Sequence, residues 1–238
     1  MLDNYRDEDK VLVAVDCIIF GFDPQEGELK LLLTKRNFEP EKGKWSLIGG
    51  FLHANESIED AAQRVLKKLT GIRNIYLQQL QVYSKIDRDP AKRTISVSFN
   101  ALLNIQNLKR PLNQRYSATW FPISHVPSLI FDHKEMLDYA ITSLRFKASY
   151  YPISFELLPE KFTIRQLQSL YEEIFSTKFD SGNFAKKVLS IGLLEKLDEK
   201  DMRSSKKGSF LYRFNEQEFQ RQGSASFYIS FQNSTISY

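Results

Sequence analysis

The apolar positions of the first 150 residues follow two periods, one typical of strands and one typical of helices. Residues 11–22 (VLVAVDCIIFGF) are dense in β-branched and aromatic types, which predicts a strand. The same reasoning predicts further strands at 29–34, 45–51, 76–85, 94–103 and 118–122. Apolar side chains recur at helical spacing in 57–70, and a helix also fits 133–147. This order of elements predicts an α+β domain.

Capping residues mark the expected ends of these two helices. Ser57, followed by Asp60, is a capping arrangement at the start of the first helix, and Gly71 is placed to end it. Asp132 is the expected N-cap of the second helix. The helix boundaries therefore rest on capping chemistry as well as on periodicity.

The last 85 residues predict two further helices. Thr163 and Gln166 form a capping box just before a stripe of apolar residues at helical spacing in 164–175. After a turn, a second helix begins, with Asp180 or Ser181 as its N-cap. Its apolar face is carried by Phe184, Val188 and Leu189, and Gly192 is placed at its end.

A hairpin with a charged tip follows these helices. Strands are predicted at 193–197 and 209–214, with the tip at 198–208. Two helices joined by a turn and followed by such a hairpin are the layout of a winged helix-turn-helix domain. The alternative is a small packing or dimerisation domain with a solvated basic loop.

A change of composition near 148–154 marks the predicted domain junction, where Pro152 breaks the preceding helix. The predicted domains are therefore 1–150 and 151–222, followed by a tail at 223–238. The tail is rich in Ser and is expected either to add a strand or to remain disordered.

Composition excludes several classes of protein. No run of about 18 apolar residues is present, so no membrane span is expected, and the charged first ten residues do not resemble a signal peptide. The single cysteine, Cys17, lies in an apolar run; this predicts a buried structural thiol without a disulfide, and a cytoplasmic location. The three histidines lack metal-ligand spacing, so neither a metal nor a cofactor is predicted.

The net charge of this mildly basic chain is +4, and the window 178–213 alone also has a net charge of +4. Residues 178–213 hold nine basic side chains against five acidic ones. In a winged helix, the exposed start of the second helix reaches base edges, and lysines of the wing contact phosphates. The residues predicted to contact DNA are Arg165, Ser181, Asn183, Lys186, Lys187, Lys206 and Lys207.

A spaced pattern of glycine, glutamate and arginine occupies residues 49–72. It resembles the signature of the Nudix hydrolases, Gly-x5-Glu-x7-Arg-Glu-(apolar)-x-Glu-Glu-x-Gly-(apolar). The residues that match the signature are Gly50, Glu56, Arg64, Leu66, Gly71 and Ile72. The resemblance implies a Nudix-type mixed-sheet domain with flanking helices.

Three glutamates of that signature are missing. Their positions hold Val65, Lys68 and Leu69. Nudix hydrolases cleave a diphosphate linkage with divalent metals, and Mg²⁺ requires carboxylate oxygens. Two of the three substitutes cannot bind a metal, and the third places a positive charge where the metal would lie. We therefore predict that the chain is not an enzyme.

Polar and aromatic residues near the expected strand ends and loops are candidates for binding a small molecule instead. Glu56 and Arg64 are expected to pair across the start of the first helix, as a scaffold or as part of the ligand site. The residues predicted to bind an effector are Lys35, Arg36, Trp45, Glu56, Asp87, Arg88, Asp132 and His133.

The two halves together resemble the bacterial Nudix-related transcriptional regulators. The runs that carry this likeness are IFDH at 130–133, FTIRQLQSLYEE at 162–173 and NFAKKVL at 183–189. The resemblance implies that an inactive Nudix domain senses a small molecule and that the winged helix binds operator DNA. It also implies a homodimer on a palindromic operator, since paired helices mirror two-fold symmetry.

The resemblance is strongest to the sugar-sensing branch of this family. The segments DCIIFGF at 16–22, KRNFEP at 35–40 and IDRDP at 86–90 carry it, and they imply a sugar such as L-arabinose as the effector. One alternative is the branch that senses ADP-ribose and controls NAD metabolism. Another is a divergent Nudix hydrolase that acts on a nucleoside diphosphate derivative, and a third is a ligand-binding protein whose C-terminal domain docks another protein.

Overall fold

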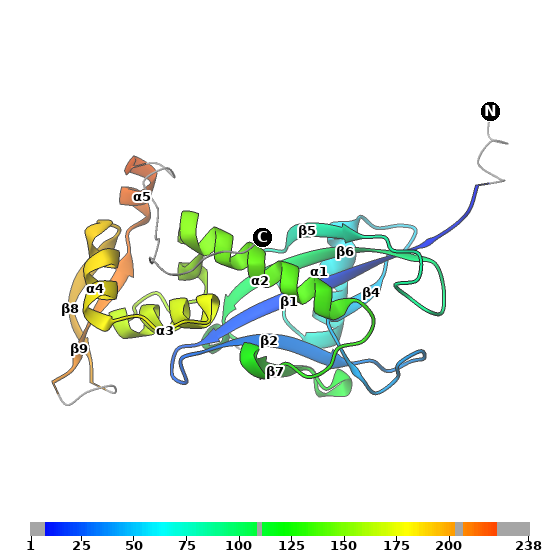
Figure 1. Ribbon diagram of the computed structural model, residues 1–238, viewed down its shortest axis with the longest axis horizontal. Coiled ribbons are helices and arrows are strands. Elements are labelled where there is room, and N and C mark those ends of the chain that lie inside the picture. Colours follow the sequence, from blue (N-terminus) through cyan, green and yellow to red (C-terminus); the bar gives the residue numbers. More distant parts are fainter. Residues whose placement is uncertain (1–7, 109–110, 203–206, 223–238) are drawn as a thin grey trace.

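The computed structural model describes residues 8–108, 111–202 and 207–222, and the tail at 223–238 lies outside them (Figure 1). The N-terminal part is built around a seven-stranded sheet in the order β3-β2-β1-β6-β5, with β4 on β1 and β7 on β2. Its strands are β1 (Leu12–Asp23), β2 (Glu28–Lys35), β3 (Trp45–Ser46), β4 (Ile48–Phe51), β5 (Gln78–Tyr83), β6 (Thr94–Asn104) and β7 (Thr119–Pro122). Because β1 and β6 run parallel while the other pairs are antiparallel, the sheet is mixed, as the sequence predicted.

Helices cover both faces of this sheet. On one face lies α1 (Ile58–Thr70), and on the other lie α2 (His133–Tyr150) and, from the C-terminal part, α3 (Ile164–Phe175). Successive side chains of β1 alternate between the two cores: Cys17 and Ile19 pack toward α1, and Ile18 and Phe20 pack toward α2. This alternation explains why β1 is apolar on both of its faces.

Short 3-10 turns connect the remaining elements of the N-terminal part. They are η2 (Ile105–Asn107), η3 (Gln114–Tyr116) and η4 (Ile123–His125). The predicted structural thiol is confirmed, since Cys17 is fully buried and burial raises the pKa of its thiol. No helix among the described residues is both long enough and apolar enough to cross a bilayer.

The C-terminal part has the layout of a winged helix. It comprises η5 (Pro152–Glu156), α3, α4 (Ser181–Ser190), β8 (Leu194–Asp201), β9 (Ser209–Phe214) and α5 (Glu216–Gln222). Its core is continuous with the core beneath α2, because Leu170 and Tyr171 of α3 belong to the same cluster as Phe20 and Leu31 of the sheet. The domain boundary at residue 150 remains a prediction, and the two parts share one apolar interior.

Several boundaries agree with the capping chemistry. Ser57 and Asp60 form a reciprocal capping box, as do Thr163 and Gln166, and Asp180 is the N-cap of α4. Asp132 is the N-cap residue of α2, as predicted, but its side chain makes no capping hydrogen bond, because both carboxylate oxygens accept hydrogen bonds from an arginine.

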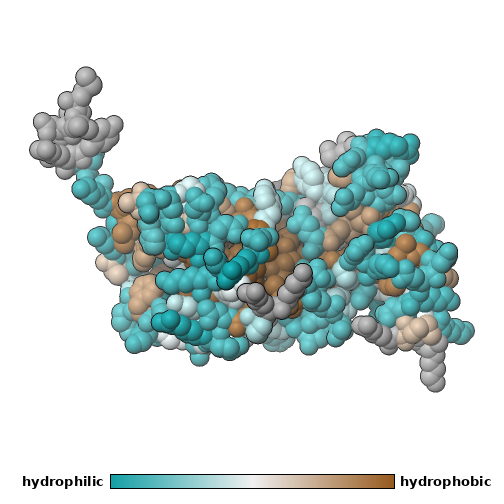
Figure 2. Space-filling view, turned by 180° about the vertical axis from the view of Figure 1, so that it is seen from behind, coloured by the Kyte–Doolittle hydropathy of each residue, from teal (hydrophilic) through white to brown (hydrophobic). Residues whose placement is uncertain are grey.

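Other differences concern element length. The helix predicted at 133–147 continues to Tyr150, and the supposed hairpin tip is shorter, because 198–201 belong to β8. The helix α5 was not predicted. Figure 2 shows the face opposite to that of Figure 1, where hydrophilic residues dominate both ends and a hydrophobic area lies between them.

Candidate functional site

A buried polar network lies where β1 crosses the first turn of α2. Its centre is Asp16, whose carboxylate accepts a hydrogen bond from Ser96 Oγ at 2.6 Å. Arg88 Nη2 and His133 Nε2 lie 3.8 and 3.6 Å from the Asp16 oxygens. A Cβ at Gly49 would lie only 2.2 Å from Asp16 Oδ1, so only glycine fits beside this carboxylate. A buried charge needs such partners, because isolated ions are costly in the interior.

Arg88 is the main counter-charge in the network. Its Nε and Nη2 each donate to one oxygen of Asp132 at 2.8 Å, a fork-to-fork pair. The side chain of Arg88 is 3% exposed and that of Asp132 is 11% exposed. Since Arg88 follows β5 in a loop and Asp132 precedes α2, the pair ties the loop to the start of that helix.

His133 is the buried titratable group of the network. Leu47 N–H donates to its Nδ1 at 3.1 Å, which places the proton of the neutral ring on Nε2, toward Asp16. Burial lowers the pKa of His133 from its usual value; Asp16 and Asp132 oppose this shift, and Arg88 and Arg36 add to it. The neutral ring is therefore the form that fits the fold.

This pKa predicts a loss of stability in mild acid. In the unfolded chain His133 binds a proton near pH 6.5, whereas in the folded chain it binds one only at lower pH. The free energy of unfolding therefore falls as the pH drops below about 6.5, by at most about 1.4 kcal/mol per pH unit. Urea unfolding between pH 7.5 and 5 measures this slope. In His133→Gln the slope should be flatter, because the titrating ring is gone; equal slopes would show that His133 does not cause it.

A small cavity of about 50 Å³ opens beside this network. Its lining combines Asp16, Arg88 and His133 with residues of the loop after β2 and of β4. The further lining residues are Ala14, Arg36, Phe38, Ser46, Gly49, Gly50, Phe51, Asp89, Thr94 and Phe131. The cavity is far smaller than the roughly 300–1,000 Å³ of typical ligand pockets. Only one part of a nucleotide-sized ligand can enter it, and the rest must lie across the rim.

Arg36 is the cation at the rim of this cavity. Its guanidinium lies over the rings of Phe38 and Phe131, 3.9 and 5.1 Å from their centroids, and its Nε donates to the Phe38 carbonyl at 3.2 Å. Among the described residues no carboxylate comes within ion-pair distance of it. Burial lowers the pKa of Arg36, but a guanidinium stays charged. The group thus has donors left for an anion.

The loop that leads into α1 is held by one ion pair. Arg64 Nε donates to Glu56 Oε2 at 2.7 Å, and Arg64 Nη2 donates to the Phe51 carbonyl at 2.9 Å. The hydrogen bond from Arg64 is the largest cause that lowers the pKa of Glu56 to about 2. Glu56 is therefore committed to the loop, and it does not line the cavity.

The face of α1 next to this loop carries no metal ligands. Val65 is 3% exposed and packs so closely on Gly50 that a Cβ there would lie 2.7 Å from Val65 Cγ2. Lys68 is exposed, and Leu69 packs against the core beneath α1. Among the described residues no group of three acidic, histidine or cysteine side chains is arranged to hold a metal ion.

The second candidate site is the exposed surface of α4. Asp180 Oδ1 accepts from the Asn183 N–H at 2.9 Å, while Phe184 and Val188 anchor the helix in the core. This geometry exposes the positions that sequence selected for DNA, namely Ser181, Asn183, Lys186 and Lys187. The helix and the β8–β9 hairpin lie at the same end of the molecule (Figure 1).

Comparisons with known proteins identify both parts of the chain. The model of the NUDIX domain matches residues 10–140, and the model of the NrtR DNA-binding winged helix domain matches residues 154–214. The chain is 30% identical over 212 residues to the "ADPR responsive transcriptional repressor NtrR" of Acinetobacter baylyi, covering 87% of this chain and 84% of that protein. The chain belongs to the NrtR-type family of Nudix-related transcriptional regulators.

Two solved structures of Shewanella oneidensis NrtR are similar to the chain. The protein bound to a 27mer DNA matches with a TM-score of 0.73 and 26% identity, over 91% of this chain and 97% of that one. Its NUDIX domain with ADP ribose matches with a TM-score of 0.52 and 29% identity, over 60% of this chain and 96% of that one. The predicted organisation of a ligand-responsive, DNA-binding regulator is confirmed at this level.

The structure gathers only part of the effector residues predicted for this NrtR-type chain. Arg36, Arg88 and His133 line the cavity, and Asp132 holds Arg88. The other predicted residues do not line this cavity, and their role in effector binding stays a prediction. Lys35 Nζ lies over Trp45, 5.1 Å from the ring centroid and outside the cavity, Asp87 is exposed, and Glu56 is bound to Arg64.

The DNA-contact residues of the NrtR-type winged helix remain predictions. Arg165 is exposed in the first turn of α3, and Lys207 is exposed beside the hairpin tip. Lys206 lies outside the described residues.

Sequence reasoning missed several residues of the cavity. A signal was available for Asp16, since a lone acidic residue inside an apolar strand must find buried partners. Gly49 carried a weaker signal, as the first residue of the glycine pair. Phe38, Asp89 and Phe131 come from loops, and nothing in their spacing indicated that they meet.

Proposed function

We propose that this protein is a transcriptional regulator whose Nudix domain binds ADP-ribose, or a closely similar nucleoside diphosphate, without cleaving it. Binding changes the affinity of the winged helix for operator DNA. The observation that carries the choice of ligand is Arg36, a half-buried cation at the cavity rim with no carboxylate partner among the described residues.

Arg36 favours an anionic ligand for an electrostatic reason. Its two aromatic neighbours hold the guanidinium plane and remove water from it, but they supply no counter-charge. A phosphate group accepts two parallel hydrogen bonds from such a fork. Asp16 and Asp89 line the same cavity and offset part of this charge, but a neutral sugar would leave the guanidinium without a direct anionic partner. ADP-ribose offers both a diphosphate for Arg36 and ribose hydroxyls for the carboxylates of Asp16 or Asp89.

The relatives support ADP-ribose over the sugar that the sequence segments implied. One relative is named as ADPR responsive, and a similar Nudix domain was solved with ADP ribose. The segment at 16–22 lies in the sheet core, so its similarity reflects packing more than ligand choice. The loops at 35–40 and 86–90 contribute Arg36, Phe38, Arg88 and Asp89 to the cavity. L-arabinose stays in the test as the competing effector.

The residues at the three glutamate positions support binding without hydrolysis. Val65 is buried against Gly50, Leu69 is packed, and Lys68 is a cation. Hydrolysis of a diphosphate needs a divalent metal to neutralise charge and to activate water. We therefore propose that the retained Glu56 and Arg64 maintain the shape of the loop rather than catalysis.

The helix α2 is the proposed route from ligand to DNA. Its first turn carries His133, beside the cavity, and it runs for 18 residues, about 27 Å. Near its other end Arg145 donates to the Ile174 carbonyl at 2.8 Å and to Ser176 Oγ at 2.9 Å, and the Ala148 carbonyl accepts from Tyr171 OH. Ligand contacts that shift the first turn of α2 therefore act directly on the end of α3.

Calorimetric titration tests the ligand. ADP-ribose is expected to bind with the same affinity in EDTA and in Mg²⁺, and to be recovered intact by chromatography, whereas L-arabinose gives no heat of binding. Saturable binding of L-arabinose without ADP-ribose binding would contradict the proposed ligand. Release of AMP and ribose phosphate in Mg²⁺ or Mn²⁺ would contradict the absence of catalysis.

A further inference from the structure

One face of the β8–β9 hairpin carries two lysines on an exposed aromatic ring. Lys196 and Lys200 of β8 place their Nζ atoms 3.7 and 4.7 Å from the ring centroid of Phe210 on β9. Phe210 remains 39% exposed. Neither lysine has a carboxylate within ion-pair distance among the described residues. We call this set the wing cluster.

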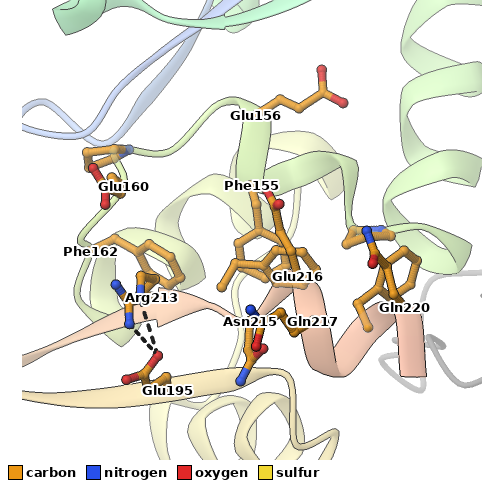
Figure 3. Close-up of a pocket in the computed structure, with 14 residues that line it drawn as sticks. Phe155, Glu156, Glu160, Phe162, Glu195, Arg213, Asn215, Glu216, Gln217 and Gln220 are labelled. Atoms are coloured by element: carbon orange, nitrogen blue, oxygen red, sulfur yellow. Dashed lines mark hydrogen bonds and ion pairs between the residues drawn. The ribbon is translucent and has the colours of Figure 1, made fainter. Parts of the chain in front are cut away.

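Two acidic residues of the hairpin, Glu195 and Glu199, are paired with cations outside the wing cluster. Glu195 pairs with Arg213 at 2.7 Å, and Glu199 pairs with Lys161 at 2.6 Å. Figure 3 shows the Glu195–Arg213 pair beside a separate cavity of about 950 Å³, next to Phe155 and Phe162. Because these two acids have their own cations, they do not neutralise Lys196 or Lys200.

The glycine backbone near the hairpin tip leaves room for the aliphatic part of the Lys200 side chain. Gly208 has a φ of 69°, in the left-handed region, and a Cβ built there would lie 3.1 Å from Lys200 Cβ and 3.2 Å from Lys200 Cδ. The stem of Lys200 therefore lies across a glycine and under the ring of Phe210. Both contacts limit the rotamers of the side chain, so less entropy is lost when its ammonium group binds an anion.

The strand register shows where the wing cluster lies relative to the domain core. Residues 210, 212 and 214 alternate onto one face of β9, and Lys196 is opposite Tyr212 while Lys200 is opposite Phe210. Tyr212 and Phe214 pack against the core that also holds Phe184 of α4. The wing cluster therefore continues, toward the tip, the face of the hairpin that packs on the helices.

We propose that the wing cluster is a binding site for the phosphates of a DNA backbone, in which Phe210 positions the two ammonium groups. This site rests on the proposed function, because it serves the DNA-binding step. An aromatic face attracts a cation electrostatically and fixes its place, while the ammonium protons stay free to reach phosphate oxygens. Its residues differ from Lys206 and Lys207, which the sequence selected for phosphate contact.

The salt dependence of DNA binding tests this site. Each lost phosphate contact should reduce the slope of log K against log salt by about 0.9, so Lys196→Gln/Lys200→Gln should reduce it by about 1.8 on specific and non-specific duplexes alike. The matched control is Lys161→Gln/Arg213→Gln, which removes the same charge from groups paired with Glu199 and Glu195. Its slope should equal that of the unmodified protein.

A second variant separates positioning from charge. Phe210→Leu keeps an apolar strand residue and both lysines but removes the ring quadrupole, so DNA binding should weaken about two- to fivefold for each lost cation–ring contact. Phe210→Tyr should restore binding.

Three outcomes contradict the wing cluster alone: an unchanged slope in the lysine variant, an equal loss in the control, or wild-type binding by Phe210→Leu. If the unmodified protein binds no duplex at low salt, the regulatory function fails together with this site.

Discussion

Replacing Arg36 by glutamine is expected to weaken ADP-ribose binding by about 10- to 150-fold. This is the loss of affinity that corresponds to one hydrogen bond to a charged group. The guanidinium is held by two rings and lacks a counter-ion among the described residues, so it is placed to receive a phosphate. Glutamine keeps polar bulk but loses both the charge and the planar fork. Calorimetry of the full chain measures the loss.

The adjacent cation supplies the control. Lys35 is exposed at the end of β2, with its Nζ over Trp45 and away from the cavity. Lys35→Gln changes net charge by the same amount and should bind ADP-ribose as the unmodified protein does. Equal losses in the two variants would mean that long-range charge attracts the ligand, and wild-type binding by Arg36→Gln would refute the assigned contact.

Replacing Arg88 by methionine is expected to lower the free energy of unfolding by about 3–5 kcal/mol, as when one partner of a buried ion pair is removed. Methionine fills part of the volume but leaves Asp132 and Asp16 without their counter-charge in a low-dielectric site. Urea unfolding followed by circular dichroism measures the change.

A second ion pair between the same two segments provides a matched comparison. Lys85 and Glu135 also join the loop after β5 to the first turn of α2, but their side chains are 66% and 52% exposed. Lys85→Gln should cost less than about 1 kcal/mol, since water screens exposed pairs. A loss below 1 kcal/mol in Arg88→Met, or equal losses in both variants, would contradict the role given to burial.

The sequence was sufficient for the parts of the fold that local chemistry determines. Capping boxes at Ser57 and Thr163 are short-range patterns, and the structure contains both. The side chains of β1 alternate between two cores, and the apolar side chains of α3 form one stripe, because strands and helices bury side chains at fixed spacings. The helix α5 was missed because seven residues with one apolar anchor give too little periodic signal.

The cavity was harder to predict, because loops and strand faces decide which side chains meet. Lys35 and Arg36 are neighbours in sequence, yet only Arg36 lines the cavity, since successive residues of an extended chain point to opposite sides. In the next loop Asp87 is exposed while Arg88 is buried. Selecting every polar residue near a strand end therefore also included residues that do not line the cavity, such as Lys35 and Asp87.

The side chain of Asp132 shows how a local preference competes with a long-range contact. Sequence favoured a helix cap, but the structure uses both carboxylate oxygens for Arg88, whose position 44 residues earlier no local pattern reveals. A bidentate pair with a buried guanidinium is stronger than a capping hydrogen bond. The long-range contact therefore prevails over the local one.

The most direct test of ligand-controlled DNA binding without catalysis is one affinity measurement. A duplex that the unmodified protein selects from a random-sequence pool is titrated at fixed salt, with and without saturating ADP-ribose, and the nucleotide is analysed afterwards. We predict that DNA affinity changes by at least about fivefold, the lower end of typical coupling between sites, and that ADP-ribose is recovered intact. An unchanged affinity with bound ligand, or a cleaved nucleotide, would contradict the account.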